Sequence, residues 1–276
     1  MKLFITGGTG FVGSHFIDKV QNLDYQIVCQ KRVRSSTRIK LREDHVWVSG
    51  NLDQDFSTDF IGCDALIHFA ASGVSPRNAN LNDVIKINTL DSYKLIESAV
   101  DNNINKFLIL GTSDEYGSSC SRYDYIPISA PLRPISNYAA SKAAFFQLLN
   151  NLTYEKKIKV IYVRLFNTFG IGQYKGNLWP SLRHAALSGE DFDLTPGEQI
   201  RTFIPIEDAV NELIKKLDFS SMNKGELIIK HIGGNEPRSI KSFVQEWWNV
   251  WGANSRLNFG AIPYRKNEIM RCVPAI

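Results

Sequence analysis

The sequence predicts an α/β protein with a doubly wound parallel sheet. Short apolar runs alternate with longer amphipathic segments, a glycine-rich turn joins the first such pair, and no repeat or low-complexity linker interrupts the pattern. Alternating strands and helices imply parallel strands whose connecting helices cover both faces of the sheet. Right-handed crossovers then favour the doubly wound arrangement.

Each expected element has its own pattern. The expected strands are apolar runs bounded by polar residues or glycine, namely Lys2–Thr6, Tyr25–Gln30, Val46–Val48, Ala65–Ala70, Phe107–Gly111 and Val160–Phe166. The expected helices have apolar residues at helical spacing, namely Phe11–Asn22, Asp83–Val100, Tyr138–Tyr154 and Val210–Leu217. After Phe166 the chain is richer in Gly, Pro and Trp. We therefore expect a sheet domain over residues 1–166, joined by segments near 201–231, and a smaller C-terminal lobe over 167–276.

The first strand leads directly into the glycine-rich turn, which precedes the first helix. Glycines let the backbone approach a pyrophosphate closely, and the unpaired N–H groups of a helix N-terminus point at it. A glycine turn placed between strand and helix therefore predicts a dinucleotide site of the Rossmann type. The residues expected to contact the dinucleotide here are Gly7, Gly10, Phe11, Val12 and Gly13.

Composition narrows the possible partners and compartment. The 276 residues are 43% hydrophobic, and no apolar run is long enough to span a bilayer. Because the first strand begins at residue 2, no signal peptide is expected. A net charge of +4 is too small to predict nucleic-acid binding, and the histidines lack the spacing of metal ligands. The cysteines, Cys29, Cys63, Cys120 and Cys272, are scattered, which predicts reduced thiols in a cytoplasmic protein.

A basic run follows the second strand and bears on the choice of dinucleotide. It comprises Lys31, Arg32, Arg34, Arg38, Lys40 and Arg42, and no carboxylate appears before Glu43. An acid at this place holds the ribose hydroxyls of NAD, whereas cations attract the 2′-phosphate of NADP. NADP(H) is therefore favoured, and NAD(H) stays possible. Arg32 is the first candidate for the phosphate contact and Lys31 the second.

Tyr138 and Lys142 lie one helical turn apart on the same expected helix. A free tyrosine has a pKa of about 10, and a nearby ammonium group favours the phenolate. We therefore expect Lys142 to lower the pKa of Tyr138. Downstream of a dinucleotide turn, this pair predicts proton transfer by Tyr138 beside the bound cofactor.

Several motifs occur in a fixed order along almost the whole chain. They are Thr6-Gly-Gly-Thr-Gly-Phe-Val-Gly13, His68-Phe-Ala-Ala71, Tyr116-Gly117, Tyr138-x-x-x-Lys142, Arg164-Leu-Phe-Asn-Thr-Phe-Gly170, Arg201-Thr-Phe-Ile-Pro-Ile-Glu-Asp208 and Pro263-Tyr-Arg-x-x-Glu268. The set resembles the extended short-chain dehydrogenase/reductases that act on nucleotide sugars. The resemblance implies a homodimer formed through the helices Asp83–Val100 and Tyr138–Tyr154. It also implies a further strand and helix after Glu268, so we expect either that part of the lobe is missing or that a partner completes it.

The resemblance further implies roles for individual residues. Thr112 would hydrogen-bond the reacting oxygen, Tyr138 would be the acid or base, Lys142 would hold the nicotinamide ribose, and Asn88 would support the site. The other implied cofactor contacts are Asn51, Leu52, Phe69, Ala70 and Ala71. The implied substrate contacts are Ser113, Asp114, Asn167, Asn177, Leu178, Trp179, Arg201 and Arg265. For Trp179, packing inside the lobe is the alternative role.

The enzymes and sensors that share this scaffold differ in the residues they carry at particular positions. The 4,6-dehydratases resemble one another in a Thr-Asp-Glu triplet, whereas here the acids after Thr112 come one place later, at Asp114 and Glu115. On an extended segment a one-residue slip points a side chain to the opposite face, which disfavours dehydration. Proteins of this fold that only sense NADP commonly lose the tyrosine or lysine, so a sensor is also disfavoured.

The 4-epimerases keep NAD bound and usually have the strand-two acid that is missing here. We therefore expect NADPH-dependent reduction of a nucleotide-linked 4-keto-6-deoxyhexose, in the biosynthesis of a surface polysaccharide. NAD-dependent 4-epimerisation of a nucleotide sugar is the alternative.

Overall fold

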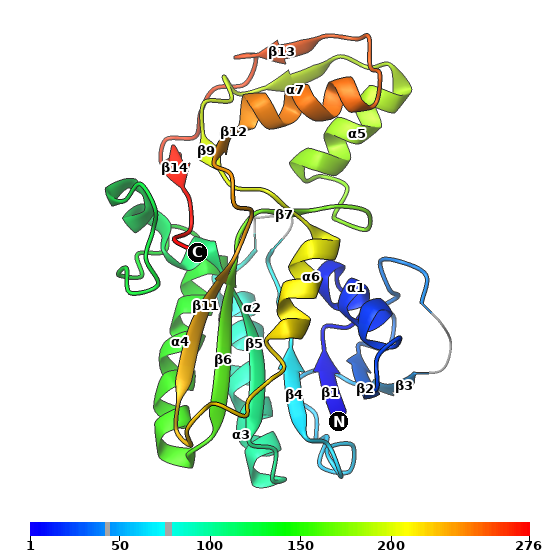
Figure 1. Cartoon of the computed structure of the whole chain (residues 1–276), viewed down its shortest axis with the longest axis vertical. Coiled ribbons are helices and arrows are strands. Elements are labelled where there is room, and N and C mark those ends of the chain that lie inside the picture. Colours follow the sequence, from blue (N-terminus) through cyan, green and yellow to red (C-terminus); the bar gives the residue numbers. More distant parts are fainter. Residues whose placement is uncertain (42–44, 75–78) are drawn as a thin grey trace.

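The structure is a computed structural model that describes residues 1–41, 45–74 and 79–276. A sheet domain forms the lower part of Figure 1, and a smaller lobe lies beyond the carboxyl ends of its strands. Arg42, Glu43 and Asp44, where the basic run meets the next acids, fall outside the described residues.

A seven-stranded parallel sheet is the centre of the structure. Its strands are β1 (Lys2–Thr6), β2 (Gln26–Lys31), β3 (Val46–Ser49), β4 (Ala65–His68), β5 (Lys106–Thr112), β6 (Lys159–Leu165) and β11 (Leu227–Ile232). They lie in the order β11-β6-β5-β4-β1-β2-β3, with parallel neighbours throughout. The predicted doubly wound sheet is confirmed. Its order reverses between β1 and β4, the place where open α/β sheets bind ligands.

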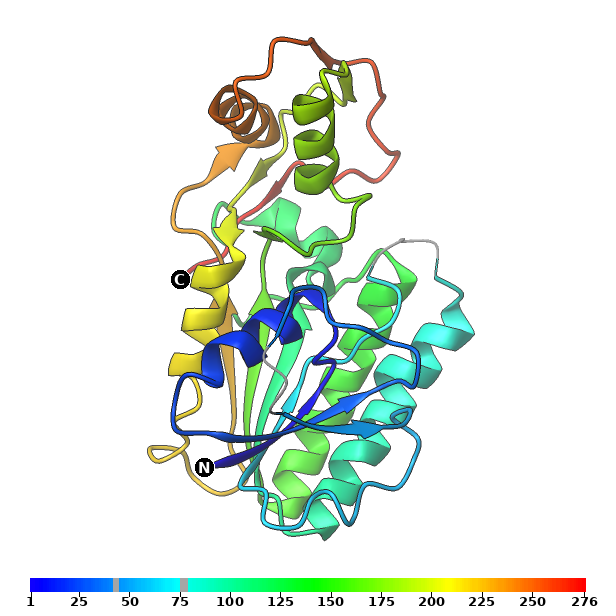
Figure 2. The same cartoon turned by 90° about the vertical axis from the view of Figure 1, so that its right-hand side faces the viewer.

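Helices cover both faces of the sheet (Figures 1 and 2). One face carries α1 (Phe11–Val20) and α6 (Ile206–Lys215), and the other carries α2 (Leu81–Ile85), α3 (Ser92–Asp101) and α4 (Asn137–Lys156). Side chains alternate between the faces along each strand. Leu3 and Ile5 therefore pack with α1 and α6, whereas Phe4 packs in the second core with α3 and α4.

A π-helical segment, Lys86–Asp91, joins α2 to α3, where the sequence predicted an uninterrupted helix. The wider π turn changes which residues face inward, and Asn88, Thr89 and Asp91 are all buried. Such segments are frequent at functional sites. Here the segment points Asn88 at the helix that carries Tyr138.

The lobe is built around α5 (Leu178–Ser188) and α7 (Ile240–Val250), which pack through Leu182, Ala185 and Val244. Short strands complete it and link it to the sheet domain: β7 (Thr168–Phe169), β8 (Phe192–Leu194), β9 (Ile200–Arg201), β10 (Ile204–Pro205), β12 (Arg238–Ser239), β13 (Leu257–Phe259) and β14 (Arg271–Cys272). Between two lobe segments the chain returns to the sheet domain as α6 and β11.

A disulfide joins Cys120 to Cys272 across 152 residues of sequence. Cys120 lies in the 3₁₀ segment Gly117–Arg122, and β14 brings Cys272 against that segment. The expectation of four reduced thiols is therefore wrong for this pair, because only the tertiary fold brings the two cysteines together. Cys29 and Cys63 are free thiols.

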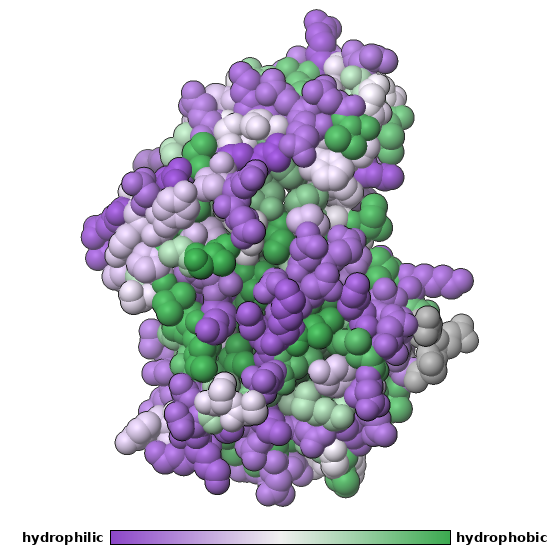
Figure 3. All heavy atoms as spheres, in the orientation of Figure 1, coloured by the Kyte–Doolittle hydropathy of each residue, from purple (hydrophilic) through white to green (hydrophobic). Residues whose placement is uncertain are grey.

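The surface is mostly hydrophilic around the lobe, and hydrophobic side chains show near β11 and α6 in the middle of the face drawn in Figure 3. This pattern fits an edge strand, since most residues of β11 are only partly buried. Within the described residues, no helix has both the length and the apolar character needed to cross a membrane.

Candidate active site

The glycine-rich turn lies at the carboxyl end of β1, packed against the segment that follows β4. Gly7 has a φ of +70°, and a Cβ atom there would lie 2.6 Å from the carbonyl carbon of Phe69. A Cβ atom on Gly13 would lie 2.9 Å from the Cα atom of Gly8. Neither position has room for a side chain. The turn therefore presents backbone to a ligand, as close approach to a pyrophosphate requires.

The N-terminus of α1 begins at this turn and is open to an anion. Gly10 makes no side-chain capping bond, and the first turn of the helix has no acidic residue. Phe11 and Val12 are partly buried against the core below. Free N–H groups and the positive end of the helix dipole suit a pyrophosphate, so the residues present fit a dinucleotide.

At the end of β2, cationic side chains border the same edge of the sheet. The Lys31 ammonium lies 5.2 Å from the centroid of the Trp47 ring, and Arg32 is exposed. Arg38 approaches the loop that leads to the lobe, because a Cβ atom on Gly172 would lie 3.1 Å from its Cβ atom. The structure thus places Lys31 near the glycine turn and Arg38 near the lobe loop.

The remaining predicted cofactor contacts lie in the loops after β3 and β4. Asn51 and Ala71 are exposed, and Ala70 is partly buried. Leu52 and Phe69 are only 8% and 9% exposed, and their side chains belong to the two cores. These two side chains therefore stabilise the sheet domain rather than form an open binding surface.

Tyr138 and Lys142 lie in the first turns of α4. The Ser136 hydroxyl caps this helix by accepting a bond from the Ala139 amide at 3.2 Å. Ser141 then ties the helix to the π segment. Its hydroxyl donates to the Tyr138 carbonyl at 2.7 Å and accepts a bond from the Asn88 amide group at 2.9 Å. Asn88 also pairs with the backbone of Ser72, so it holds the helix and the loop after β4 together.

Burial dominates the electrostatics of the pair. It raises the pKa of Tyr138, and the charges of Asp114 and Glu115 raise it further, while a bond from Thr112 opposes them. Burial lowers the pKa of Lys142, which is 2% exposed, to about 8. The expectation that Lys142 lowers the pKa of Tyr138 is wrong for the chain alone, because desolvation outweighs the ammonium charge. A tyrosine with a raised pKa is protonated at neutral pH and suits the role of proton donor.

Thr112 ends β5 and faces Tyr138 across the site. It caps a 3₁₀ turn, Ser113–Glu115: its hydroxyl accepts a bond from the Asp114 amide at 3.2 Å, and its own amide donates to Glu115 Oε1 at 2.9 Å. The structure therefore brings Thr112, Tyr138 and Lys142 to one place, as predicted from the sequence.

The sequence analysis assumed that the two acids after Thr112 lie on an extended segment, and this assumption is wrong. They lie in the 3₁₀ turn, so their directions are set by that turn. Asp114 is exposed, whereas Glu115 is fully buried and pairs with Arg164 at 2.8 Å. The acids face different surroundings, and Ser113 between Thr112 and Asp114 is partly buried.

Predicted substrate residues line the path from the sheet domain to the lobe. Asn167 is exposed, and its side-chain amide donates to the Thr202 carbonyl at 3.1 Å. Arg201, on β9, donates to the carbonyls of Ile200 and Ile269 and lies 3.9 Å from Glu268. Its guanidinium is thus held in place by the lobe.

The other predicted substrate residues differ in exposure. Arg265 is exposed, and Asn177 and Leu178 are partly buried at the start of α5. Trp179 is 7% exposed and packs among Phe169, Trp247 and Trp251. Packing of the lobe, the alternative role for Trp179, is therefore what the structure shows, although its indole N–H has no hydrogen-bond partner among the described residues.

Sequence reasoning missed the polar groups that lie behind Thr112 and Tyr138. Glu115, Tyr162 and Arg164 form a buried cluster, and Ser141 and Thr89 link α4 to the π segment. One signal was present in the sequence: Thr112 followed three residues later by Glu115 is a capping box. The other links join distant parts of the chain and have no local pattern.

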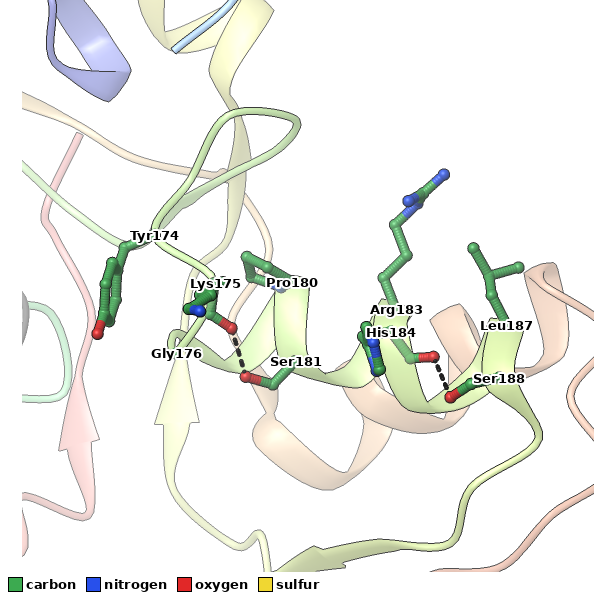
Figure 4. A pocket seen from close by; sticks show the side chains of 9 residues that line it. All are labelled: Tyr174, Lys175, Gly176, Pro180, Ser181, Arg183, His184, Leu187 and Ser188. Carbon is green, nitrogen blue, oxygen red and sulfur yellow. Dashed lines mark hydrogen bonds between the residues drawn. The ribbon is translucent and has the colours of Figure 1, made fainter. Parts of the chain in front are cut away.

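A pocket of about 750 Å³ lies at α5, away from these groups. Tyr174, Lys175, Arg183 and His184 are among its lining residues, and the Ser181 hydroxyl donates to the Lys175 carbonyl at 2.8 Å (Figure 4). None of the predicted site residues lines it. Across the described part of the chain, no cluster of His, Cys, Asp and Glu is arranged to hold a metal ion.

Comparison with known proteins identifies relatives along most of the chain. The model of the NAD dependent epimerase/dehydratase family matches residues 3–228. The CDP-abequose synthase of Salmonella muenchen is 25% identical over 272 residues, which cover 98% of this chain and 87% of that protein.

Two solved structures share the fold. The UDP-glucose 4-epimerase of Thermotoga maritima, solved with UDP-glucose, has a TM-score of 0.88 at 20% identity and covers 99% of this chain and 89% of its own. The dTDP-glucose 4,6-dehydratase DesIV of Streptomyces venezuelae, solved with NAD, has a TM-score of 0.85 at 24% identity, with 99% and 88% covered.

Proposed function

Because the chain belongs to the NAD-dependent epimerase/dehydratase family, we propose that it is a nucleotide-sugar 4-ketoreductase that uses NADPH. Members of this family are NAD(P)-dependent enzymes that act on nucleotide sugars. The substrate we propose is a nucleotide-linked 4-keto-6-deoxyhexose, and the product carries a 4-hydroxyl group. The observation that carries the proposal is the convergence of Thr112, Tyr138 and Lys142 beside the glycine turn, with cationic side chains at the end of β2.

A bound nicotinamide cofactor supplies the hydride in this reaction. Tyr138 donates the proton that the ketone oxygen needs as it becomes a hydroxyl, and Thr112 donates a hydrogen bond to the same oxygen. The raised pKa of Tyr138 keeps its proton available at neutral pH. Lys142, buried beside Tyr138, would hold the nicotinamide ribose, and its ammonium charge would stabilise the phenolate that Tyr138 becomes when it gives up its proton.

The proposal of NADPH rests on the residues that follow β2. Lys31 and Arg32 stand where an NAD site would place an acid, and positions 32–41 contain no Asp or Glu. Solved relatives such as DesIV contain NAD, so NAD is the cofactor that we assign to the alternative reaction. That alternative is 4-epimerisation, favoured by the similarity of the fold to a UDP-glucose 4-epimerase.

The proposal extends to location and assembly. We propose a cytoplasmic enzyme of surface polysaccharide biosynthesis that acts as a homodimer. Leu90, Leu148 and Tyr154, on the π segment and α4, are 51%, 42% and 69% exposed, which suits a helix–helix interface. A Leu148→Glu variant should then elute as a monomer in size-exclusion chromatography, while an unchanged elution volume would contradict this interface.

One experiment tests the reaction. The protein is incubated with NADPH or NADH and a panel of dTDP-, CDP-, GDP- and UDP-linked 4-keto-6-deoxyhexoses, and cofactor oxidation is followed at the nicotinamide absorbance. The proposal expects stoichiometric NADPH oxidation with one of these substrates. Interconversion of 4-hydroxyl epimers without net oxidation would instead establish the epimerase.

A further inference from the structure

Glu115 is a buried carboxylate to which the proposed reaction assigns no step. It ends the 3₁₀ turn Ser113–Glu115 and is 0% exposed. Its Oε1 atom accepts bonds from the Thr112 amide at 2.9 Å and from the Tyr162 hydroxyl at 2.8 Å. Its Oε2 atom accepts a bond from Arg164 Nε at 2.8 Å. Both carboxylate oxygens are therefore engaged, one of them by the backbone of Thr112.

Arg164 is itself fixed in position. It is 1% exposed, donates to the Tyr116 hydroxyl at 2.8 Å, and lies 4.6 and 4.7 Å from the ring centroids of Tyr116 and Phe146. A buried ion pair adds little net stability, because desolvation opposes the attraction of the charges. What the Glu115–Arg164 pair does supply is a definite geometry for the turn that follows Thr112.

The neighbouring glycine makes room for this arrangement. A Cβ atom on Gly111 would lie 2.7 Å from Glu115 Oε1 and would also collide with the Tyr162 ring. Gly111 does not have a positive φ, so the requirement here is space rather than backbone conformation. The residue before Thr112 is thus a glycine whose absent side chain lets Glu115 reach the Thr112 amide.

We propose that Glu115 is a positioning residue, whose buried carboxylate holds Thr112 at the distance from Tyr138 that the reaction requires. The inference rests on the proposed function only in that Thr112 and Tyr138 act on the same substrate oxygen. It applies equally to net reduction and to epimerisation, since both use this pair.

The charge of Glu115 gives the proposal a second readout. The groups around Glu115 are Asp114 on its own turn, Tyr116 directly after it, Tyr138 and Lys142 on α4, and Tyr162 and Arg164 on β6. After burial and the charge of Asp114, Glu115 is a further cause that raises the pKa of Tyr138. Replacing it by a neutral residue removes this effect and leaves the Arg164 charge uncompensated. Both changes lower the pKa of the Tyr138 phenol.

The test is the Glu115→Gln variant, with Glu155→Gln as a matched control at the exposed far end of α4. We expect kcat to fall about 10- to 100-fold, since one donor to the reacting oxygen is displaced. In the reductive direction the alkaline limb of the kcat profile should move to lower pH, because loss of the Glu115 charge lowers the pKa values of both Tyr138 and Lys142. KM and cofactor affinity should stay within about twofold, and the control should match the wild type.

A second variant separates position from charge. Glu115→Asp keeps the carboxylate but shortens it by one methylene, so it should lower kcat and leave the alkaline limb in place. It also keeps the test open if Glu115→Gln does not fold. A fall in kcat with no movement of the limb in Glu115→Gln, or full activity in Glu115→Asp, would overturn the proposal.

Failure of the proposed function is distinguishable from failure of this inference. If the wild type turns over none of the sugar nucleotides, the reaction has been wrongly assigned. Hydrogen–deuterium exchange of residues 107–117 then decides the role of Glu115. Faster exchange at the Thr112 amide in both variants, at an unchanged melting temperature, supports the proposal, and unchanged exchange contradicts it.

Discussion

The catalytic end of the sheet and the lobe hold their functional side chains in different ways. At the sheet, the Thr112 amide donates to Glu115 and the Tyr138 carbonyl accepts a bond from Ser141, which Asn88 holds in turn. In the lobe, the exposed Arg265 and the loop-held Arg201 stand on short strands and an irregular segment. The first region is rigid on the side away from the substrate, and the second is open.

This difference indicates a division of labour. A reacting pair must be held within a fraction of an ångström, which buried bonds to rigid elements achieve. Selection among nucleotide sugars needs only surface contacts, which loops on a scaffold supply. We therefore expect substitutions at the sheet to change kcat or folding stability, and substitutions in the lobe to change KM.

The largest effect is expected for Tyr138→Phe. Removing the phenol hydroxyl removes the proton donor, so kcat should fall about 10³-fold, within the usual range for general acid catalysis. The ring stays in place, and cofactor affinity should be unchanged by fluorescence titration. Tyr125→Phe, which removes the hydroxyl of an exposed tyrosine outside α4, is the control. Activity in Tyr138→Phe close to that of the wild type would remove the catalytic assignment of the whole region.

Lys142→Met tests whether burying the Lys142 ammonium in the sheet region lowers the folding stability. Burial lowers the folded pKa of Lys142 to about 8, below its ordinary value of 10.5. The unfolded chain thus binds this proton more tightly, and charging the buried group destabilises the fold by on the order of 3 kcal/mol at neutral pH. The Met variant should therefore melt at a higher temperature than the wild type at pH 7, and we expect it to be inactive.

The sign of the pH dependence follows from the same pKa values. Between pH 8 and 10.5 the unfolded state binds more of this proton than the folded state. The free energy of unfolding of the wild type should therefore rise toward that of Lys142→Met as the pH rises over this range. Denaturant unfolding at several pH values measures the difference. A gap between wild type and Lys142→Met that does not narrow over this range would show that Lys142 is not a buried ammonium.

Much of the sheet region could be predicted from the sequence, because its pattern is local. Strand and helix periodicity located the elements, and the spacing of Tyr138 and Lys142 pointed to the pair that we propose takes part in the reaction. The inward turn of Glu115 and the π segment around Asn88 were not predicted. Each depends on a partner far away in sequence, Arg164 and Ser141 respectively, and periodicity carries no information about such pairs.

The lobe was less predictable for the same reason. Trp179 was given a possible nucleotide contact, but its surroundings are aromatic rings from Phe169 and α7, which only the folded chain assembles. The Cys120–Cys272 disulfide likewise joins residues that no spacing rule connects. Irregular segments with little periodicity leave their tertiary neighbours unspecified.

Arg201→Ala tests the open region. The guanidinium is placed by the Ile200 and Ile269 carbonyls, and an arginine–phosphate interaction contributes about 1.5–3 kcal/mol. KM for the sugar nucleotide should therefore rise roughly 10- to 100-fold, with kcat changed by less than about threefold. Arg256→Ala, an exposed lobe arginine paired with Asp191, is the control. A loss confined to kcat would mean that the lobe takes part in positioning as the sheet does.

The smallest expected effect is a change in cofactor preference, caused by substitutions at the end of β2. Lys31 lies over Trp47, whose ring is 3.5 Å from where a Cβ atom on Gly8 would be, so its ammonium borders the glycine turn. Arg32 is exposed one residue later.

Arg32→Ala should lower the ratio of kcat/KM for NADPH over NADH about tenfold, with NADH kinetics unchanged. Lys31→Ala measured beside it shows which cation meets the 2′-phosphate, and Arg34→Ala is the control for charge alone. An unchanged ratio in both variants would remove the preference for NADPH and with it the main reason for choosing reduction over epimerisation.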